Sequence, residues 1–204
     1  MNRLYSLLLM AFTCGATLLL FSSCATTPPS KFYTLHALTD TISAKQKGGS
    51  EKAIGVEIGP LSLPAFLDRP QIVTRTNSTE LIFAEFDRWA EPLDKNISAV
   101  LTENLSILIP SDSIYSYPWR GSPKVDFQVA INVVRFDVTS DGRASFVVRW
   151  TIYEGNSREV LLKKKSHFTE SANSNDYHSL VSALNKTLED FSRKVAATIK
   201  GLRH

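Results

Sequence analysis

The 204-residue sequence has only two cysteines, and no thiol follows Cys24. The remainder of the chain therefore cannot form a disulfide, a cysteine nucleophile or a Cys-ligated metal site. Histidine is also scarce, with four residues and no His-x-x-x-His or His-Glu-x-x-His spacing to suggest zinc. Gly-x-Ser-x-Gly elbows and glycine-rich phosphate loops are missing as well. The sequence thus predicts no catalytic residue, no metal and no cofactor, and the protein is expected not to be an enzyme.

The sequence has no large excess of positive or negative charge: it contains 23 Lys and Arg and 20 Asp and Glu, which gives a net charge of +3. Nucleic-acid-binding proteins usually carry a strongly basic face, so no nucleic acid partner is predicted. Apolar types at 43% and charged types at 21% are ordinary for a globular protein. This composition excludes a disordered tail and a polytopic membrane protein, and the length fits one domain.

The one long uncharged apolar run lies at the start of the chain. Arg3 precedes 18 uncharged residues, Leu4 to Phe21, and the run ends in the small residues Ser22 and Ser23 before Cys24. A basic start, an apolar stretch and a small-residue exit are typical of a secretory signal peptide. We predict a lipoprotein signal peptide over 1–23, a tether over 24–30 and a folded domain over 31–202.

The exit of this signal resembles the bacterial lipobox, in which a cysteine behind small residues is acylated and becomes the mature N-terminus. Cys24 is therefore the predicted lipid-attachment residue, carrying fatty chains such as palmitate, although Phe21 stands where Leu is usual. Ala25 replaces the Asp that retains such proteins in the inner membrane, which implies the periplasmic face of the outer membrane. Two alternatives stay open: acylation at Cys14, or an uncleaved anchor, because 18 residues approach the ~20 needed to span a bilayer.

Hydrophobic periodicity predicts an α+β domain. Apolar residues recur every three or four positions over 92–109 and about 176–200, which is typical of helices. Alternating segments predict strands at 31–38, 54–58, 71–75, 80–85, 125–138, 144–152 and 160–168. Turn signals at Asp141-Gly142 and Gly155-Asn156 join the last three into an antiparallel meander, with a bulge near Val133. The predicted fold is a single α+β domain whose antiparallel or mixed sheet is covered by two long amphipathic helices.

Several polar features receive plain structural interpretations. Asp87 and Glu91 flank Trp89 like an acid/base pair, but carboxylates just before a helix are favoured by its dipole. The run Lys163 to Lys165 predicts an exposed edge strand, since lysine is a common edge protector. Asn-x-Ser/Thr sequons are interpreted as chance matches; they begin at Asn77, Asn96, Asn104 and Asn185.

Specific strings indicate a family. Phe-Tyr-Thr-Leu stands at 32–35, Leu-Pro-Ala-Phe-Leu-Asp-Arg-Pro at 63–70, Asp-Arg-Trp-Ala-Glu-Pro-Leu at 87–93 and Tyr-Pro-Trp at 117–119. Together and in this order they resemble the ABC-type transport auxiliary lipoproteins, the group that includes the paraquat-inducible protein C-like lipoproteins. The resemblance covers nearly all of residues 30–200.

The resemblance implies a lipid-anchored, non-catalytic accessory that docks an intermembrane lipid-transport system containing a mammalian-cell-entry (MCE) domain protein. That MCE-domain protein and the membrane are the expected partners, and a homo-oligomer is compatible with the sequence. The strings either fix a loop and a helix entry or contact the partner, and the candidate contact residues are Pro64, Asp68, Arg69, Pro70, Trp89 and Glu91. A direct periplasmic lipid carrier and an exported enzyme are the alternative functions.

Overall fold

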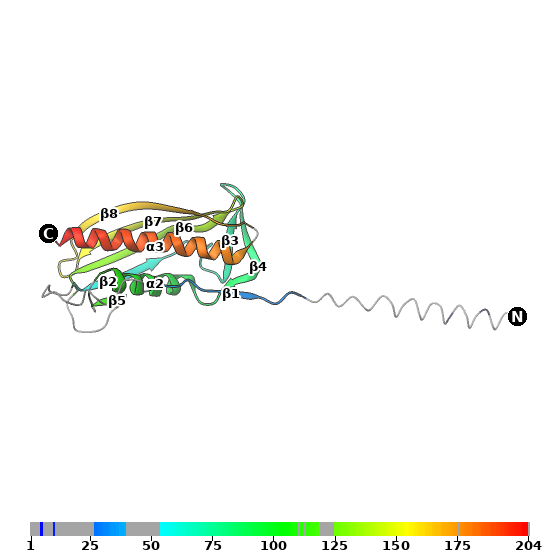
Figure 1. The fold of residues 1–204 in the computed structure, drawn as a ribbon, viewed down its shortest axis with the longest axis horizontal. Coiled ribbons are helices and arrows are strands. Elements are labelled where there is room, and N and C mark those ends of the chain that lie inside the picture. The colour runs from blue at the N-terminus through cyan, green and yellow to red at the C-terminus, as the bar shows by residue number, and fades with distance from the viewer. Residues whose placement is uncertain are drawn as a thin grey trace.

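The computed structural model describes residues 5, 10, 27–39, 54–109, 111, 113–118, 125–174 and 176–203. Cys24 and most of the predicted 39–52 loop lie outside these residues. The described part of the chain forms a mixed α+β domain, in which a curled eight-stranded sheet carries two helices on one face (Figure 1). The helices are α2 (Leu93–Leu108) and α3 (Tyr177–Leu202). Within the described residues, no helix is both long and apolar enough to cross a membrane.

Strand β6 (Phe127–Thr139) organises the sheet because it pairs with three other strands. On one edge it lies parallel to β2 (Val56–Ser62) and then to β3 (Gln71–Arg75), and on the other it is antiparallel to β7 (Arg143–Glu154). Beyond β3, the sheet adds β4 (Leu81–Trp89), which pairs with β3, and then β1 (Lys31–Tyr33), which pairs with β4. Beyond β2 it adds β5 (Ile114–Ser116), and beyond β7 it adds β8 (Val160–Ser171). The edge strands of the described sheet are therefore β1, β5 and β8.

The predicted meander is confirmed in β6, β7 and β8. The register shifts between Val133 and Arg135, where the sequence predicts a bulge. Gly142 turns the chain into β7 with φ of +79°, and a Cβ there would lie 2.2 Å from the carbonyl oxygen of Ala172, so glycine is required. All three lysines of 163–165 are exposed on β8, which pairs with β7 alone, as expected of an edge strand.

The core lies between the sheet and the helices. Helix α3 begins at its N-cap Asp176, whose carboxylate accepts the N–H groups of His178 and Ser179 at 3.1 Å. Phe191 of α3 meets Phe146 and Trp150 of β7 edge-on, at centroid distances of 5.4 and 5.8 Å. Helix α2 packs against β2 and β5, and α3 packs against β6, β7 and β8. Each helix thus covers its own part of the same face.

The opposite face of the sheet buries the charged side chain of Asp137. Asp137 of β6 has no exposed side-chain surface, and its oxygens accept hydrogen bonds from Arg75 Nη2 at 3.0 Å and Arg135 Nε at 2.6 Å. A carboxylate this deep is stable only with such partners. The bond from Arg75 ties β3 to β6 where the two strands are joined by only a short ladder, whereas the bond from Arg135 lies within β6.

Several predicted boundaries are wrong. The strand predicted over 31–38 ends at Tyr33, and the strand predicted over 54–58 continues through Gly59 and Pro60 to Ser62 with a register shift. β4 runs on to Trp89, so this residue ends a strand and does not start the helix. The helix predicted at 92–109 begins at Leu93, one residue after Pro92.

Candidate functional site

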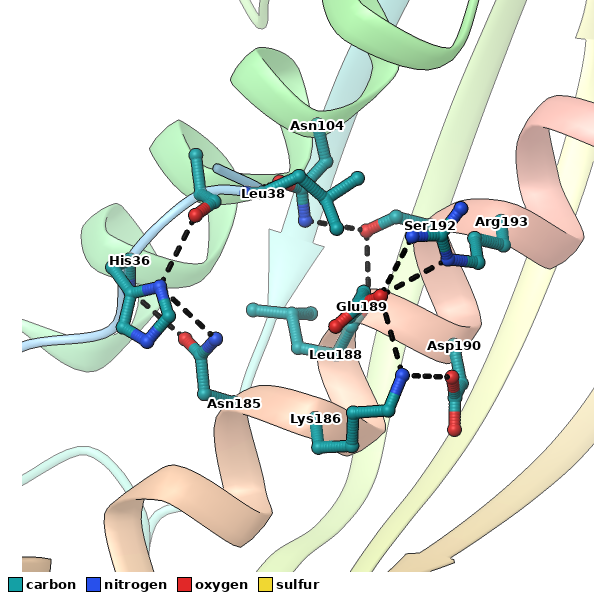
Figure 2. A network of polar contacts seen from close by, with 11 residues as sticks. His36, Leu38, Asn104, Asn185, Lys186, Leu188, Glu189, Asp190, Ser192 and Arg193 are labelled. Atoms are coloured by element: carbon teal, nitrogen blue, oxygen red, sulfur yellow. Dashed lines mark hydrogen bonds and ion pairs between the residues drawn. The ribbon is translucent and has the colours of Figure 1, made fainter. Parts of the chain in front are cut away.

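Residues 34–38, which we call the strap, run between the two helices without pairing to any strand. The N–H groups of Leu35, His36 and Leu38 each donate to an asparagine side-chain oxygen, at 2.7, 2.8 and 2.7 Å. The acceptors are Asn96 and Asn104 of α2 and Asn185 of α3, as Figure 2 shows for the last two. The strap follows β1, the first element after the predicted tether, so these three bonds hold the N-terminal part of the fold against both helices.

Asparagine suits this task because its side chain carries both an acceptor and two donors. An extended segment without a strand partner must find acceptors for its N–H groups, and the asparagine oxygens supply them. Asn104 also donates from Nδ2 to Ser192 Oγ at 2.9 Å, and that hydroxyl donates to the carbonyl of Leu188 at 2.8 Å (Figure 2). One buried side chain therefore joins the strap, α2 and α3.

Glu91, one of the candidate contact residues, acts on the strap through Asn96. Its Oε1 accepts a hydrogen bond from Asn96 Nδ2 at 2.6 Å, and the same amide donates to Thr34 Oγ1 at 3.0 Å. With Nδ2 held on this side, Oδ1 points to the N–H of Leu35. The carboxylate thus sets the orientation of the asparagine that holds the strap.

Tyr33 joins the strap to the edge of the sheet. Its hydroxyl donates to Asp87 Oδ1 at 2.7 Å, and its carbonyl accepts the N–H of Ala90 at 2.8 Å. Burial raises the pKa of the Tyr33 hydroxyl to about 12, and the bond to the Asp87 carboxylate adds to the rise. Asp87 and Glu91 therefore hold structural hydrogen bonds to Tyr33 and Asn96, contacts that the predicted role at the helix dipole did not include.

The structure gathers all six candidate contact residues at one end of the molecule, which we call the β1–β4 end: strands β1 and β4 with residues 63–70 and Glu91. Pro70 accepts the N–H of Trp89 at 2.7 Å, and the Arg69 guanidinium lies 4.0 Å from the centre of the Phe83 ring. Pro64 is half-buried and its carbonyl accepts the N–H of Leu67 at 2.9 Å, closing a turn.

These six residues divide into a surface group and a structural group. Asp68, Arg69 and Pro70 are exposed. Trp89 is only 5% exposed and packs against Phe136 with ring centroids 6.3 Å apart, so its contact is with the core. Glu91 is exposed, yet its carboxylate is occupied by Asn96. Among these six residues, the exposed surface that is not taken up by a hydrogen bond to another side chain is therefore that of residues 68–70.

The sequence analysis did not identify the three helix asparagines that hold the strap, although the sequence contains a signal for them. Asn96, Asn104 and Asn185 lie among the apolar residues that α2 and α3 bury, and each is under 9% exposed. Asparagine is unfavourable inside helices, and a buried amide needs partners, so its presence there indicates a polar task. Reading these positions as sequons hid that indication. Asn77, the fourth sequon, instead closes a turn by accepting the N–H groups of Thr79 and Glu80.

A shallow hollow of about 220 Å³ lies beside the strap. Its lining comes from β1, the strap and the first turns of α3: Phe32, Tyr33, Thr34, His36, His178, Val181, Ser182 and Asn185. This volume is below the roughly 300–1,000 Å³ of typical ligand pockets. Over the residues that the structure describes, no group of three or more His, Cys, Asp or Glu is placed to hold a metal ion.

Comparison with solved structures supports the fold. A crystal structure of an uncharacterized protein matches with a TM-score of 0.68 at 17% identity, covering 84% of this chain and 99% of that one. A protein of Xanthomonas campestris matches with a TM-score of 0.67 at 15% identity, covering 85% and 98%. Both likenesses confirm a mixed α+β fold of this kind.

Comparison of sequences supports a family. The chain is 25% identical over 142 residues to the intermembrane transport lipoprotein PqiC of Escherichia coli, covering 70% of this chain and 73% of that protein. PqiC of Shigella flexneri matches with the same values. Residues 33–196 match the profile of the ABC-type transport auxiliary lipoprotein component, from the start of the strap region to the last turns of α3. The protein therefore belongs to the ABC-type transport auxiliary lipoprotein family.

Proposed function

We propose that this protein is a non-catalytic accessory lipoprotein of an intermembrane lipid-transport system, anchored by Cys24 to the periplasmic face of the outer membrane. In this role it docks an MCE-domain protein of the same system. The observation that carries the proposal is the family match over residues 33–196, which begins nine residues after Cys24. The similarity to a lipoprotein named for intermembrane transport supports the same role.

The domain organisation follows from this proposal: a signal peptide over 1–23, a tether over 24–30 and a folded domain over 31–202. The described fold begins with β1 at Lys31 and its last helix ends at Leu202, which supports the outer bounds of the domain. The strap supports the anchoring role, because it fixes the chain to both helices a few residues after the tether.

For docking, we propose the exposed 68–70 segment as the contact with the partner. Residues of a loop on a rigid scaffold often carry binding, and this loop is held by the bond from Trp89 N–H to the Pro70 carbonyl. Pro64 fixes the preceding turn, while Trp89 and Glu91 support the loop and the strap from within the fold.

The anchoring half of the proposal is tested on the full chain expressed in a bacterial host. Mass spectrometry of the mature protein is expected to show an acylated N-terminal Cys24, and Cys24→Ala is expected to abolish recovery in the outer-membrane fraction. An intact leader or an unmodified thiol would refute it, as would acylation at Cys14.

The docking half is tested by co-purification with a co-expressed MCE-domain protein of an intermembrane transport system. Arg69→Ala is expected to reduce the recovered partner severalfold, whereas Lys200→Ala, a cation lost from the last turn of α3, is expected to leave it unchanged. Equal recovery with both variants would remove the 68–70 segment from the interface. A direct lipid carrier would instead be indicated by lipid that co-purifies with the protein and is identified by mass spectrometry.

A further inference from the structure

The β1–β4 end exposes apolar side chains close to the point where the chain enters the fold. Phe32 of β1 is 66% exposed, and Ile82 and Phe83 of β4 are 52% and 38% exposed. Single exposed apolar residues are common on soluble proteins, so exposure alone decides nothing. Tyr117, just after β5, and Val160 and Leu161, at the start of β8, are also exposed. Strand β5 lies at the other end of the molecule from β1 and β4 (Figure 1).

Strand register places the two phenylalanines on one face. Tyr33 lies opposite Trp89, whose ring packs on the core residue Phe136, so Tyr33 faces the core and its neighbour Phe32 projects from the opposite face. Arg75 reaches Asp137 on that opposite face, and Val73, two residues earlier on β3, lies opposite Phe83. Alternation on either side of the register shift between Gln71 and Val73 therefore puts Phe32 and Phe83 on the same face of β1, β4 and β3. Arg69 lies over the Phe83 ring on that side.

The tether distinguishes this end from the other. Cys24 and Lys31 are seven residues apart, which spans at most about 25 Å when fully extended. β1 cannot swing away from the fold, since it pairs with β4 and continues into the strap held by three asparagines. In Figure 1 the chain enters beside β1 and β4, and helix α3 ends at the opposite end. A lipid on Cys24 therefore keeps the β1–β4 end within reach of the bilayer.

We propose that the outer face of β1 and β4 rests on the membrane, with Phe32 and Phe83 inserted at the boundary between headgroups and acyl chains, while the polar 68–70 segment stays at the rim of this contact, where it meets the partner protein. This inference rests on the proposed acylation of Cys24 and adds the surface that faces the lipid. This end has no excess of positive charge: Lys31, Arg69 and Arg88 stand with Asp68, Glu85, Asp87 and Glu91. Attraction to anionic lipid is therefore not the basis of the contact, and apolar insertion does not weaken with salt.

Depth-dependent fluorescence quenching on the full lipoprotein tests the orientation. The mature acylated protein has no free thiol, so a single introduced cysteine takes an environment-sensitive dye. We place the dye at Glu85→Cys, an exposed position on β4, and in a matched variant at Ala197→Cys, an exposed position near the far end of α3. Both proteins are reconstituted into phosphatidylcholine vesicles with and without nitroxide-labelled lipid.

The dye at position 85 is expected to be quenched severalfold more strongly than the dye at 197, at low and high salt alike. Adding Phe32→Ser and Phe83→Ser should bring the two values together while the acyl chains keep the protein on the vesicles. Equal quenching at both positions, or no effect of the serines, would overturn the orientation alone. A salt-sensitive signal would overturn apolar insertion. The oligomeric state is also measured in detergent. If the two serine substitutions dissociate an oligomer there, and the two dyes are quenched equally on vesicles, this face binds a second copy of the chain and the proposal is overturned.

The same material separates this inference from the proposed function. Protein that carries no acyl group at Cys24 refutes the proposed anchor and the orientation together. Acylated protein with equal quenching refutes only the orientation.

Discussion

Glu91 Oε1 accepts a hydrogen bond from Asn96 Nδ2 at 2.6 Å, although the two residues belong to different sequence features. Glu91 lies in the Arg-Trp-Ala-Glu-Pro-Leu string, and Asn96 stands in the first turns of α2. Their contact links that string to the strap, because Asn96 holds the N–H of Leu35. A residue first considered for partner contact thus has a structural task within the chain.

Glu91→Ala is expected to lower the free energy of unfolding by about 1 kcal/mol, because Asn96 loses the acceptor that orients it. Glu103→Ala, an exposed carboxylate further along α2, is the control and should change stability little. Urea unfolding measures both. If Glu91→Ala keeps wild-type stability yet loses the partner, the residue belongs to the interface.

Asn104→Ala is expected to cost about 1–3 kcal/mol, because the Leu38 N–H loses its acceptor and Ser192 its donor. The strap should also become more open, so the Leu38 amide should exchange faster with deuterium. Asn156→Ala, in the exposed turn before β8, is the matched asparagine control. Equal losses for the two variants would contradict the task assigned to Asn104.

Trp89→Ala is expected to destabilise the protein by about 3–5 kcal/mol, since it removes a buried ring packed on Phe136. Arg69→Ala, which removes an exposed side chain, should change stability far less. Thermal or urea unfolding of the two variants measures the difference. A mild effect of Trp89→Ala would indicate that the ring is not part of the core.

Asp137→Asn is expected to destabilise by about 3–5 kcal/mol, the range for removing one partner of a buried ion pair, because Arg75 and Arg135 lose their counter-charge. Asp190→Asn breaks an exposed pair with Lys186 and should stay within about 0.5 kcal/mol. Urea unfolding at neutral pH compares them. Similar small losses would show that Asp137 is solvated.

Stability is expected to fall as the pH rises from about 10 to about 12, because the pKa of Tyr33 is raised in the folded state. The unfolded state loses its tyrosine proton first, so the contribution is complete below pH 10 and declines above it. Tyr33→Phe should flatten this part of the profile, measured by urea unfolding at a series of alkaline pH values. An unchanged slope would contradict the raised pKa.

The sequence predicts the regular elements well where the pattern is long. The meander, its bulge near Val133 and both helices follow from alternation or from apolar spacing, because each buries one face against the core. The strap defeats this reasoning: residues 31–38 alternate like a strand, but only Lys31–Tyr33 finds a partner strand in β4. The N–H groups beyond Tyr33 pair instead with side chains 61 to 149 residues away, which local periodicity cannot reveal.

In the candidate site, too, the sequence predicts the location of the residues but not their long-range contacts. Family strings locate the β1–β4 end, but they do not show that Trp89 is buried or that Glu91 binds Asn96, since both facts depend on how α2 meets the end of β4. Asp68, Arg69 and Pro70 do reach the surface. The three asparagines on the buried faces of α2 and α3 were the sequence feature that could have indicated the strap, because buried amides need hydrogen-bond partners.

The strap also has a mechanical consequence for a protein held by its N-terminal end. Tension on that end enters through the β1–β4 ladder and then spreads through Asn96 and Asn104 into one helix and Asn185 into the other. Because β1 runs parallel to β4, a pull along the chain strains several backbone bonds together, not one after another. If the N-terminal end is anchored as proposed, the load is shared by both helices before it reaches the hydrophobic interior, so the domain resists unfolding from its first residue.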